Sequence, residues 1–258
     1  MFSQNFKNRY YKLKNLWFQI RMWGVGLRDE TVDENILTGK KVIIIGPAES
    51  SLHYMSGEEI DKYDIIIRMN NAPFSLKGKE HLIGSRTDIL FHCCSEDPIV
   101  GGGVIIPEVL FQQKVKQVIY PMDEISLLSH YYRVRLKYSG LNISRLPGSY
   151  YWKLKQNYKG NIPTTGLQTL NYLLHSDCKE LHITGFTFFT TPYIEGYKPE
   201  AYRSGEKAFE LAISSATHDP KDELRLFREI YLKQMNTKKI FLDEELTRIL
   251  QQIPPSSI

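Results

Sequence analysis

One histidine stands directly before a segment that can start a helix, a position suited to proton transfer. His218 precedes Asp219 and Pro220, and proline is favoured in the first turn of a helix. The positive end of a helix dipole disfavours the imidazolium ion, so we expect His218 to stay neutral near pH 7 and to accept a proton. Glu223 follows in the spacing His-x-x-x-x-Glu. The competing interpretation is an ordinary histidine beside a helix cap.

The sequence Pro163-Thr164-Thr165-Gly166 is a second candidate site, because it should open a helix. The threonines can cap that helix, and Gly166 lets a ligand approach the backbone closely. The first turn of a helix offers unpaired N–H donors and a positive dipole end, and both favour a phosphate. In isolation, such a motif is more often a structural cap than a ligand site.

Two apolar runs end in residues typical of a nucleotide-binding edge. The run 41–45 leads into Gly46 and a serine-rich turn that contains Ser50, where backbone N–H groups can face a ligand. The run 65–69 ends in Asn70, which could also be a simple turn residue. An acid that could hold a ribose and a G-x-G-x-x-G motif are both missing, which argues against an NAD site.

The elements that position these residues read as one α/β domain. Five short apolar runs without polar alternation suit strands buried on both faces, and they cover 41–45, 65–69, 88–91, 117–120 and 180–184. Helical patterns are clearest at 165–175 and 220–235, whereas 101–103 and 131–161 are predicted to be loops or small excursions. The expected fold is a single Rossmann-like, doubly wound, mostly parallel sheet. The tail 254–258 is expected to be frayed.

Residues 1–36 are predicted to form a basic amphipathic extension, and 37–258 the main domain. Apolar residues recur at helical spacing on one face, namely Phe6, Tyr10, Leu13, Trp17 and Ile20. Lysines and arginines are interleaved with them, so the helix within residues 1–30 could lie on an anionic membrane surface. The alternative is that this face packs on the protein's own core or on a second subunit.

Composition narrows the class of protein. A hydrophobic fraction of 42% with 24% charged residues is ordinary for a globular enzyme, and a net charge of +4 is too mild to indicate nucleic-acid binding. The three cysteines form no disulfide framework or metal-ligand spacing, and Cys93 and Cys94 are interpreted as small buried residues. Without a signal peptide or an apolar stretch near 18 residues, a cytoplasmic location is expected.

In this order, the motifs resemble the L, S and VS sialylmotifs of the family 29 sialyltransferases. We expect a bacterial-type member of that family. The L motif corresponds to 41–46 and 60–73, the S motif to 163–166 and 183–186, and the VS motif to 218–223. The resemblance implies the family's GT-A-like variant of the fold. It also implies an inverting glycosyltransferase that moves an acidic 2-keto sugar from a CMP-activated donor to a glycan hydroxyl. No Asp-x-Asp pair is present, so no metal cofactor is expected.

The resemblance also assigns roles to residues. His218 corresponds to the general base that deprotonates the acceptor, and Glu223 to a supporting residue. Asn70 corresponds to a nucleotide contact, and the S-motif residues to the group that holds phosphate and cytidine. The predicted donor-binding set is Gly46, Ser50, Asn70, Thr164, Thr165, Gly166 and Gly185.

Three positions depart from the family's pattern. The usual Gly-Asn of the first turn is replaced by Gly46-Pro47, so one nucleotide contact is lost or passes to Ser50 or Ser51. Pro192 stands where the family has a histidine that helps the leaving phosphate, and Tyr193 or Tyr197 could donate to that phosphate instead. The family's S-motif cysteine is present as Cys178, but its usual partner is missing. No disulfide is therefore expected, as in a cytoplasmic protein.

The sequence leaves the substrates open. Sialic acid is the favoured donor sugar, and Kdo, another CMP-activated 2-keto acid, is the alternative. A glycan or glycolipid acceptor is expected, in bacterial surface polysaccharide synthesis at the inner face of the membrane. Two hypotheses from different functional classes compete with this one. The chain could be a noncatalytic CMP-sugar-binding protein, or a nucleotide-binding α/β protein of unrelated chemistry.

Overall fold

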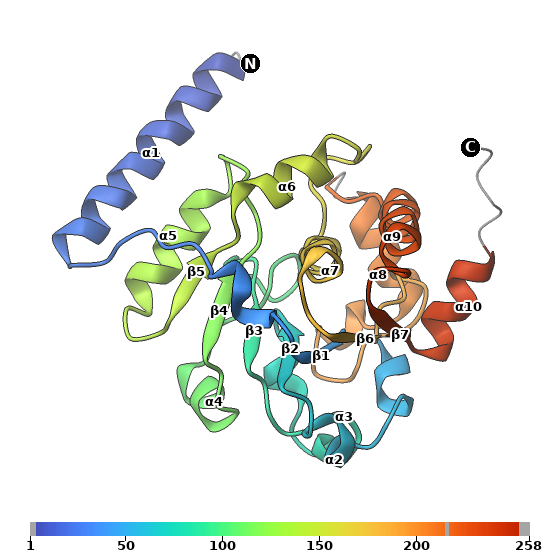
Figure 1. The fold of residues 1–258 in the computed structure, drawn as a ribbon. Coiled ribbons are helices and arrows are strands. Elements are labelled where there is room, and N and C mark those ends of the chain that lie inside the picture. Colours follow the sequence, from blue (N-terminus) through green and yellow to red (C-terminus); the bar gives the residue numbers. More distant parts are fainter. Residues whose placement is uncertain (1–3, 215–216, 253–258) are drawn as a thin grey trace.

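The computed structural model describes residues 4–214 and 217–252, and its centre is a seven-stranded sheet (Figure 1). All six strand pairs are parallel, in the order β5-β4-β3-β2-β1-β6-β7. The strands are β1 (Lys41–Ile45), β2 (Ile65–Met69), β3 (Ile89–Phe91), β4 (Gln117–Tyr120), β5 (Ile143–Arg145), β6 (Glu180–Thr184) and β7 (Lys239–Leu242). The predicted doubly wound α/β sheet is confirmed.

Helices cover both faces of the sheet. They are α1 (Gln4–Gly24), α2 (Gly57–Ile60), α3 (Glu80–Ile83), α4 (Pro107–Gln112), α5 (Leu128–Lys137), α6 (Gly148–Lys155), α7 (Thr165–His175), α8 (Gly205–Ser214), α9 (Pro220–Gln234) and α10 (Glu244–Gln252). Short 3-10 helices η1 to η4 lie at Glu34–Leu37, Glu49–His53, Ala72–Ser75 and Glu200–Tyr202. Figure 1 shows α6, α7 and α9 on one side of the strands and α2, α3 and α4 on the other.

Side chains of β1 show how the layers are held together. Val42 and Ile44 belong to the core shared with α7 and α9, whereas Ile43 and Ile45 pack with α2 on the opposite face. All four are buried. A fully buried aliphatic side chain of this size contributes roughly 1.5–3 kcal/mol, compared with roughly 0–1 kcal/mol for a surface ion pair. The apolar strands therefore stabilise the fold and fix the strand ends that carry the site.

Strands in the middle of the sheet were predicted well and the outer ones were not. The predicted bounds of β1, β2, β4 and β6 and of α7 are those observed, β3 begins one residue later and α9 ends one residue earlier. The prediction that 131–161 is a loop is wrong, because it holds most of α5, all of β5 and α6. β5 has three residues and β7 alternates in exposure, as edge strands do, so neither produces an apolar run. The loop at 101–103 is confirmed, and 254–258 lies outside the described residues.

The N-terminal helix forms as predicted, but the face that it buries is not the aromatic one. Asn15 and Met22 are buried, and the Gln19 amide donates to the Tyr132 hydroxyl of α5 at 2.7 Å. The predicted apolar face is exposed by half or more, at Phe6, Tyr10, Leu13, Trp17 and Ile20. Packing of that face on the chain's own core is therefore wrong for the described residues. Across 4–214 and 217–252, no helix combines the length and apolar character needed to cross a bilayer.

Candidate active site

Residues after β1 and β6 meet where the winding of the sheet changes direction. From β1 the chain builds strands toward β5, and it then returns to place β6 and β7 on the other side of β1. Ligands of open α/β sheets bind outside the carboxyl ends of the strands at such a point. Gly46 and Gly185 touch here, since a Cβ on Gly46 would lie 2.2 Å from the Gly185 carbonyl oxygen. Two glycines are needed because the loops cross at backbone distance.

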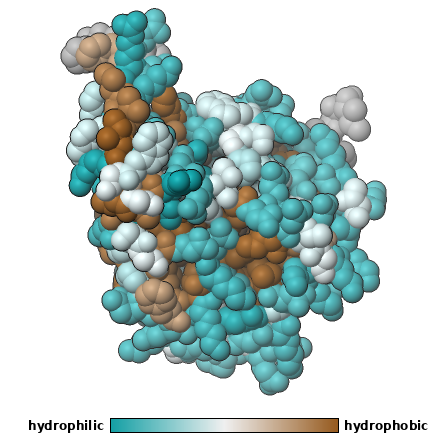
Figure 2. Space-filling view, turned by 60° about the vertical axis from the view of Figure 1, so that its left-hand side comes forward, coloured by the Kyte–Doolittle hydropathy of each residue, from teal (hydrophilic) through white to brown (hydrophobic). Residues whose placement is uncertain are grey.

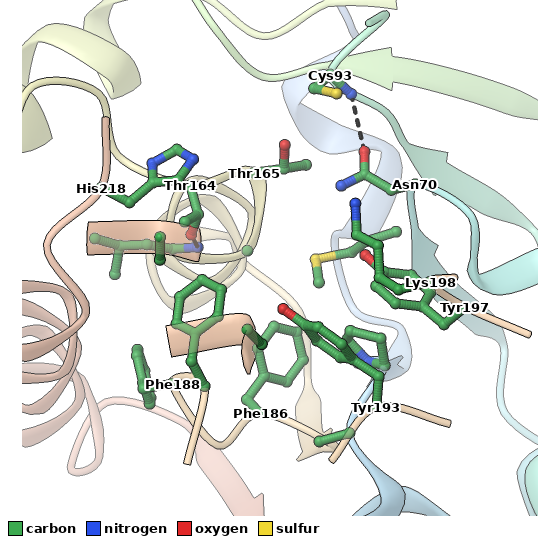
Figure 3. Close-up of a pocket in the computed structure, with 18 of the residues that line it drawn as sticks. Asn70, Cys93, Thr164, Thr165, Phe186, Phe188, Tyr193, Tyr197, Lys198 and His218 are labelled. Carbon is green, nitrogen blue, oxygen red and sulfur yellow. Dashed lines mark hydrogen bonds between the residues drawn. The ribbon is translucent and has the colours of Figure 1, made fainter. Parts of the chain in front are cut away.

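A pocket beside this crossing brings together most of the predicted site (Figure 3). Eight of the ten predicted residues line it, namely His218, Glu223, Tyr193, Asn70, Thr164, Thr165, Gly166 and Gly185. Gly46 is not among the lining residues, and its role is the close crossing with Gly185.

Ser50 lies elsewhere, and the structure does not place it at the pocket. Its hydroxyl donates to the Asp243 carboxylate at 3.1 Å, and the buried Ser51 hydroxyl donates to the Ala48 carbonyl at 2.9 Å. The idea that either serine replaces the family's asparagine contact is therefore not supported. Pro47 and Ala48 line the pocket at that turn instead.

A buried hydrogen-bond network fixes the start of α7. Thr164 caps the helix, with its hydroxyl oxygen accepting from the Leu167 N–H at 3.1 Å. The Thr164 hydroxyl donates to one oxygen of Glu223 at 2.6 Å, and the Thr164 N–H donates to the other at 2.7 Å. The Tyr158 hydroxyl donates to the same carboxyl at 3.3 Å and accepts from the Asp219 N–H at 2.6 Å. Glu223 thus ties the first turns of α7 and α9 together.

Burial is the largest cause of the raised pKa of Glu223. Its side chain is buried, and removal from water raises its pKa to about 7 although Thr164 and Tyr158 donate to it. The carboxyl therefore keeps its proton to a higher pH than an exposed glutamate does. Its contacts are those of a positioning residue, which agrees with the supporting role that the resemblance implies.

The position of His218 suits a proton acceptor. Its Nδ1 lies 2.7 Å from the Ile162 carbonyl oxygen, and because a carbonyl only accepts, Nδ1 carries the proton. The other ring nitrogen, Nε2, then has a free lone pair. Burial lowers the pKa of the imidazole below its ordinary value, partly offset by the bond to Ile162. A neutral His218 was predicted from the helix end, and burial lowers its pKa in the same direction.

Asn70 is held in an unusual backbone conformation at the end of β2. Its φ is 49°, and its side-chain oxygen accepts from the Cys93 N–H at 3.1 Å. The Asn70 amide also interacts with the Tyr197 hydroxyl. Asparagine is among the few non-glycine residues that adopt this left-handed conformation readily. Asn70 lines the pocket, and its conformation is also that of a turn residue that closes a strand.

Tyr193 reaches the pocket from a loop that folds back over the strand ends. Its backbone pairs with Ala48, and its N–H donates to the Arg203 carbonyl at 2.9 Å. Burial raises the pKa of its hydroxyl well above the ordinary value, so the group stays protonated and can donate. Figure 3 shows this hydroxyl directed into the pocket. The ring of Tyr197 lies 5.1 Å away, centroid to centroid.

The sequence analysis missed several residues that line the pocket, most of them in the segment that follows β6. Phe188 and Phe189 have φ values of 50° and 66°, and this left-handed pair sends the chain after β6 around the pocket. Cys93, predicted to be a small buried residue, is only half-buried and lines the pocket, whereas Cys94 is in the core. Lys198 was also missed. The aromatic run from Phe186 was the available signal for the segment after β6.

The family model for glycosyltransferase family 29 (sialyltransferase) matches residues 43–128. A type 2 lactosamine alpha-2,3-sialyltransferase from Rattus norvegicus is 25% identical over 232 residues, covering 79% of this chain and 64% of the relative. The Homo sapiens protein of the same description is 24% identical over 223 residues, covering 76% and 63%. By these two comparisons the chain is similar to the family 29 sialyltransferases. It spans somewhat less than two thirds of the length of these relatives.

Structural comparison agrees with this relationship at the level of fold. The crystal structure of the monofunctional alpha-2,3-sialyltransferase Cst-I from Campylobacter jejuni matches with a TM-score of 0.52 and 15% sequence identity. The match covers 89% of this chain and 83% of that structure. The family model contains the first of the three motifs, and the second and third lie beyond residue 128. Cys178, at the position of the family's S-motif cysteine, is buried and free.

Proposed function

We propose that this chain is an inverting, CMP-sugar-dependent glycosyltransferase of sialyltransferase type. One observation carries the proposal: a neutral His218 shares a single pocket with the capped start of α7 and with Asn70. A proton acceptor, a phosphate-binding helix end and a nucleotide contact are the parts that such a transfer needs. Their joint presence in a relative of the sialyltransferases supports an enzyme over a noncatalytic CMP-sugar-binding protein.

The reaction follows from the positions of the groups. CMP lies across the strand ends, with its phosphate at the first turn of α7, where backbone N–H groups and the dipole are favourable. His218 Nε2 accepts the proton of the acceptor hydroxyl as that oxygen attacks the anomeric carbon. The bond from this carbon to the phosphate oxygen breaks through an oxocarbenium-like transition state, and CMP leaves. The Tyr193 hydroxyl donates a hydrogen bond to the departing phosphate.

The proposed donor sugar is sialic acid. The names of the matched relatives support it, while Kdo stays the alternative because it is also a CMP-activated 2-keto acid. The proposed acceptor is a glycan or glycolipid in bacterial surface polysaccharide synthesis. We also propose that no metal cofactor is needed, since a monophosphate leaving group has less charge to neutralise than a diphosphate and the sequence has no Asp-x-Asp pair.

Donor and nucleotide preference test the proposal. Calorimetry with CMP, UMP and GMP should show clear preference for CMP. CMP release from CMP-sialic acid and from CMP-Kdo, followed by mass spectrometry with candidate acceptors, should then identify the donor. CMP binding without transfer to any acceptor would favour the noncatalytic alternative, and equal binding of all three nucleotides would favour unrelated chemistry.

The exposed face of α1 supports a second part of the proposal, contact with the inner face of an anionic membrane. Residues 1–28 contain six lysines and arginines and no aspartate or glutamate. Figure 1 shows α1 projecting from the body, and Figure 2 shows apolar side chains gathered along it. Beyond the predicted face, Leu16, Trp23 and Val25 are also exposed. Aromatic side chains with neighbouring cations suit the boundary between headgroups and acyl chains.

Liposome flotation tests this contact with the folded chain. Because α1 packs on α5, a double variant of exposed residues, Trp17→Ser with Trp23→Ser, is cleaner than removal of residues 1–30. Phe111→Ser, at a residue 63% exposed on α4, is the control. We expect the full chain and the control to float with vesicles containing anionic lipid and the double variant to stay behind. Equal flotation of all three proteins contradicts membrane contact through α1. If instead the wild type is a dimer and the double variant is not, the exposed face of α1 packs on a second subunit.

A further inference from the structure

The pocket contains a cation that the reaction outlined above does not use. Among the residues found to line it, Lys198 is the only lysine or arginine. A CMP-activated acidic sugar carries two anionic groups, the phosphate and the carboxylate. The start of α7 provides only partial positive charge. The inference below rests on the proposed function and names a further binding residue for it.

The Lys198 ammonium is held by neutral groups. Its Nζ donates to the carbonyl oxygens of Ile99 at 2.7 Å, Gly101 at 2.9 Å and Pro98 at 3.5 Å. It also lies 5.9 Å from the centre of the Tyr197 ring. In the described part of the chain, no carboxylate forms an ion pair with it. Backbone carbonyls orient an ammonium, but they do not neutralise it.

The charge of Lys198 is therefore poorly compensated where it lies. Burial lowers its pKa below the ordinary value for lysine, although Cys93 and Asp97 act in the opposite direction. Lys198 is only partly buried, but a charge removed from part of its water is still costly unless it is paired, and an anionic ligand oxygen would supply the missing partner. This is the environment of a cation that is kept for a ligand.

The same loop places Lys198 beside the nucleotide side of the pocket. Gly101, which accepts from Lys198, lines the pocket. The next residue, Gly102, packs on Asn70, since a Cβ there would lie 2.7 Å from the Asn70 side-chain oxygen. Figure 3 shows the Lys198 side chain reaching toward Asn70. Lys198 and Asn70 thus contact adjacent residues of one loop.

We propose that the Lys198 ammonium pairs directly with an anionic oxygen of the donor, either of the nucleotide phosphate or of the sugar carboxylate. In the free protein the carbonyls of 98–101 hold it in place. On binding, an anionic oxygen joins or replaces them, so that Lys198 contributes affinity through its charge. A hydrogen bond to a charged group of this kind is typically worth about a tenfold to hundredfold change in affinity.

Three ligands separate the two anionic groups. Calorimetry would compare cytidine, CMP and CMP-sialic acid on the wild type, on Lys198→Met and on Lys198→Gln, which keeps an N–H donor but removes the charge. Lys62→Met is the control for loss of one positive charge, because Lys62 is exposed and its one ion pair among the described residues is with the exposed Glu58, four residues earlier. Thermal unfolding of each variant confirms that it is folded.

If the phosphate is the partner, both Lys198 variants lose about tenfold to hundredfold in CMP affinity and little in cytidine affinity. If the carboxylate is the partner, CMP and cytidine are unaffected and only CMP-sialic acid binds more weakly. Two results overturn the inference and leave Lys198 as a residue that only positions the loop. In the first, both Lys198 variants bind each of the three ligands as tightly as the wild type does. In the second, the variants lose the same affinity for all three ligands, cytidine included. A wild type that binds no CMP overturns the proposed function itself, which is a different result.

Discussion

The two walls of the pocket are built in different ways. One wall, formed by the start of α7 and the start of α9, is fixed by a buried network in which the Glu223 carboxyl accepts from Thr164 and Tyr158. The other, formed by Asn70, the 93–103 loop and residues 186–203, is fixed by close backbone approaches, left-handed residues and the tilted ring pair of Tyr193 and Tyr197. The first wall holds the chemistry in place, and the second shapes the space for the ligand.

This difference predicts how substitutions on each wall should behave. On the first wall, changes to side chains such as His218 and Thr164 should affect turnover or stability more than ligand affinity, because in the proposed complex the phosphate is held there by backbone N–H groups. On the second, they should affect ligand affinity more than stability. The predictions that follow test this division, from the largest expected effect to the smallest.

His218→Ala should reduce turnover by about 10²–10⁴-fold, because general base catalysis is typically worth that much. The Kd for CMP should stay within about threefold, since Nε2 lies beside the nucleotide to accept the acceptor's proton and forms no hydrogen bond with CMP in this account. Rates of CMP release in the presence of acceptor measure the turnover, and calorimetry measures the Kd for CMP. Wild-type turnover in this variant would remove His218 from the mechanism.

Thr164→Val should destabilise the fold by about 2–4 kcal/mol. The change removes a helix cap, worth about 0.5–2 kcal/mol, and leaves the buried Glu223 carboxyl with one donor fewer, worth about 1–3 kcal/mol. Chemical denaturation measures the difference. Thr247→Val, at a half-buried position in α10 where the hydroxyl donates to the Asp243 carbonyl, is the control. A loss no larger than in the control would show that the Glu223 network is not structural.

The stability of the wild type should fall with rising pH through the titration of Glu223. The pKa in the folded state, about 7, lies above the ordinary value of 4.5, so the folded state binds the proton more tightly and loses this advantage as the pH rises. The group therefore costs about 2–3 kcal/mol more at pH 8 than at pH 5. Denaturation of the wild type and of Glu223→Gln at both pH values isolates this contribution. Parallel pH dependence of the two proteins would contradict it.

Asn70→Gly should weaken CMP binding by about tenfold and lower stability by about 1 kcal/mol, because the Cys93 N–H loses its acceptor. Glycine adopts the φ of 49° without strain, so only the side-chain contact is lost. Asn70→Ala, which adds backbone strain of about 1–2 kcal/mol, should show the same loss of affinity with a lower melting temperature. Unchanged CMP affinity in Asn70→Gly would make Asn70 a structural residue and weaken the division between the walls.

What the sequence could predict follows this division only in part, because Asn70 and Tyr193 of the second wall were predicted as well. His218, Thr164 and Glu223 belong to the first wall, and they sit in short motifs whose chemistry is visible from neighbouring residues. Central strands were also predictable, since burial on both faces leaves continuous apolar runs such as 41–45 and 65–69. Local signals were therefore sufficient for most of the sheet and marked residues in half of the site, while the roles predicted for those residues came from the resemblance to the family.

The remaining features depend on contacts that are distant in sequence. Ser50 was predicted to face the ligand, but its partner is Asp243, far along the chain. Lys198 is held in the pocket because its ammonium donates to the carbonyl oxygens of Ile99 and Gly101. No pattern in the sequence around Lys198 predicts such a contact. The edge strands β5 and β7 are short or half-exposed, so periodicity does not reveal them.

The central claim is that an uncharged His218, protonated on Nδ1, faces the space that CMP occupies. Nitrogen-15 NMR of the histidine side chains tests it most directly, with the His218 signal assigned by comparison with His218→Gln. We predict a neutral Nδ1–H tautomer at pH 7 whose Nε2 resonance shifts as CMP is added. An imidazolium at pH 7, the opposite tautomer, or a signal that does not respond to saturating CMP would contradict the account.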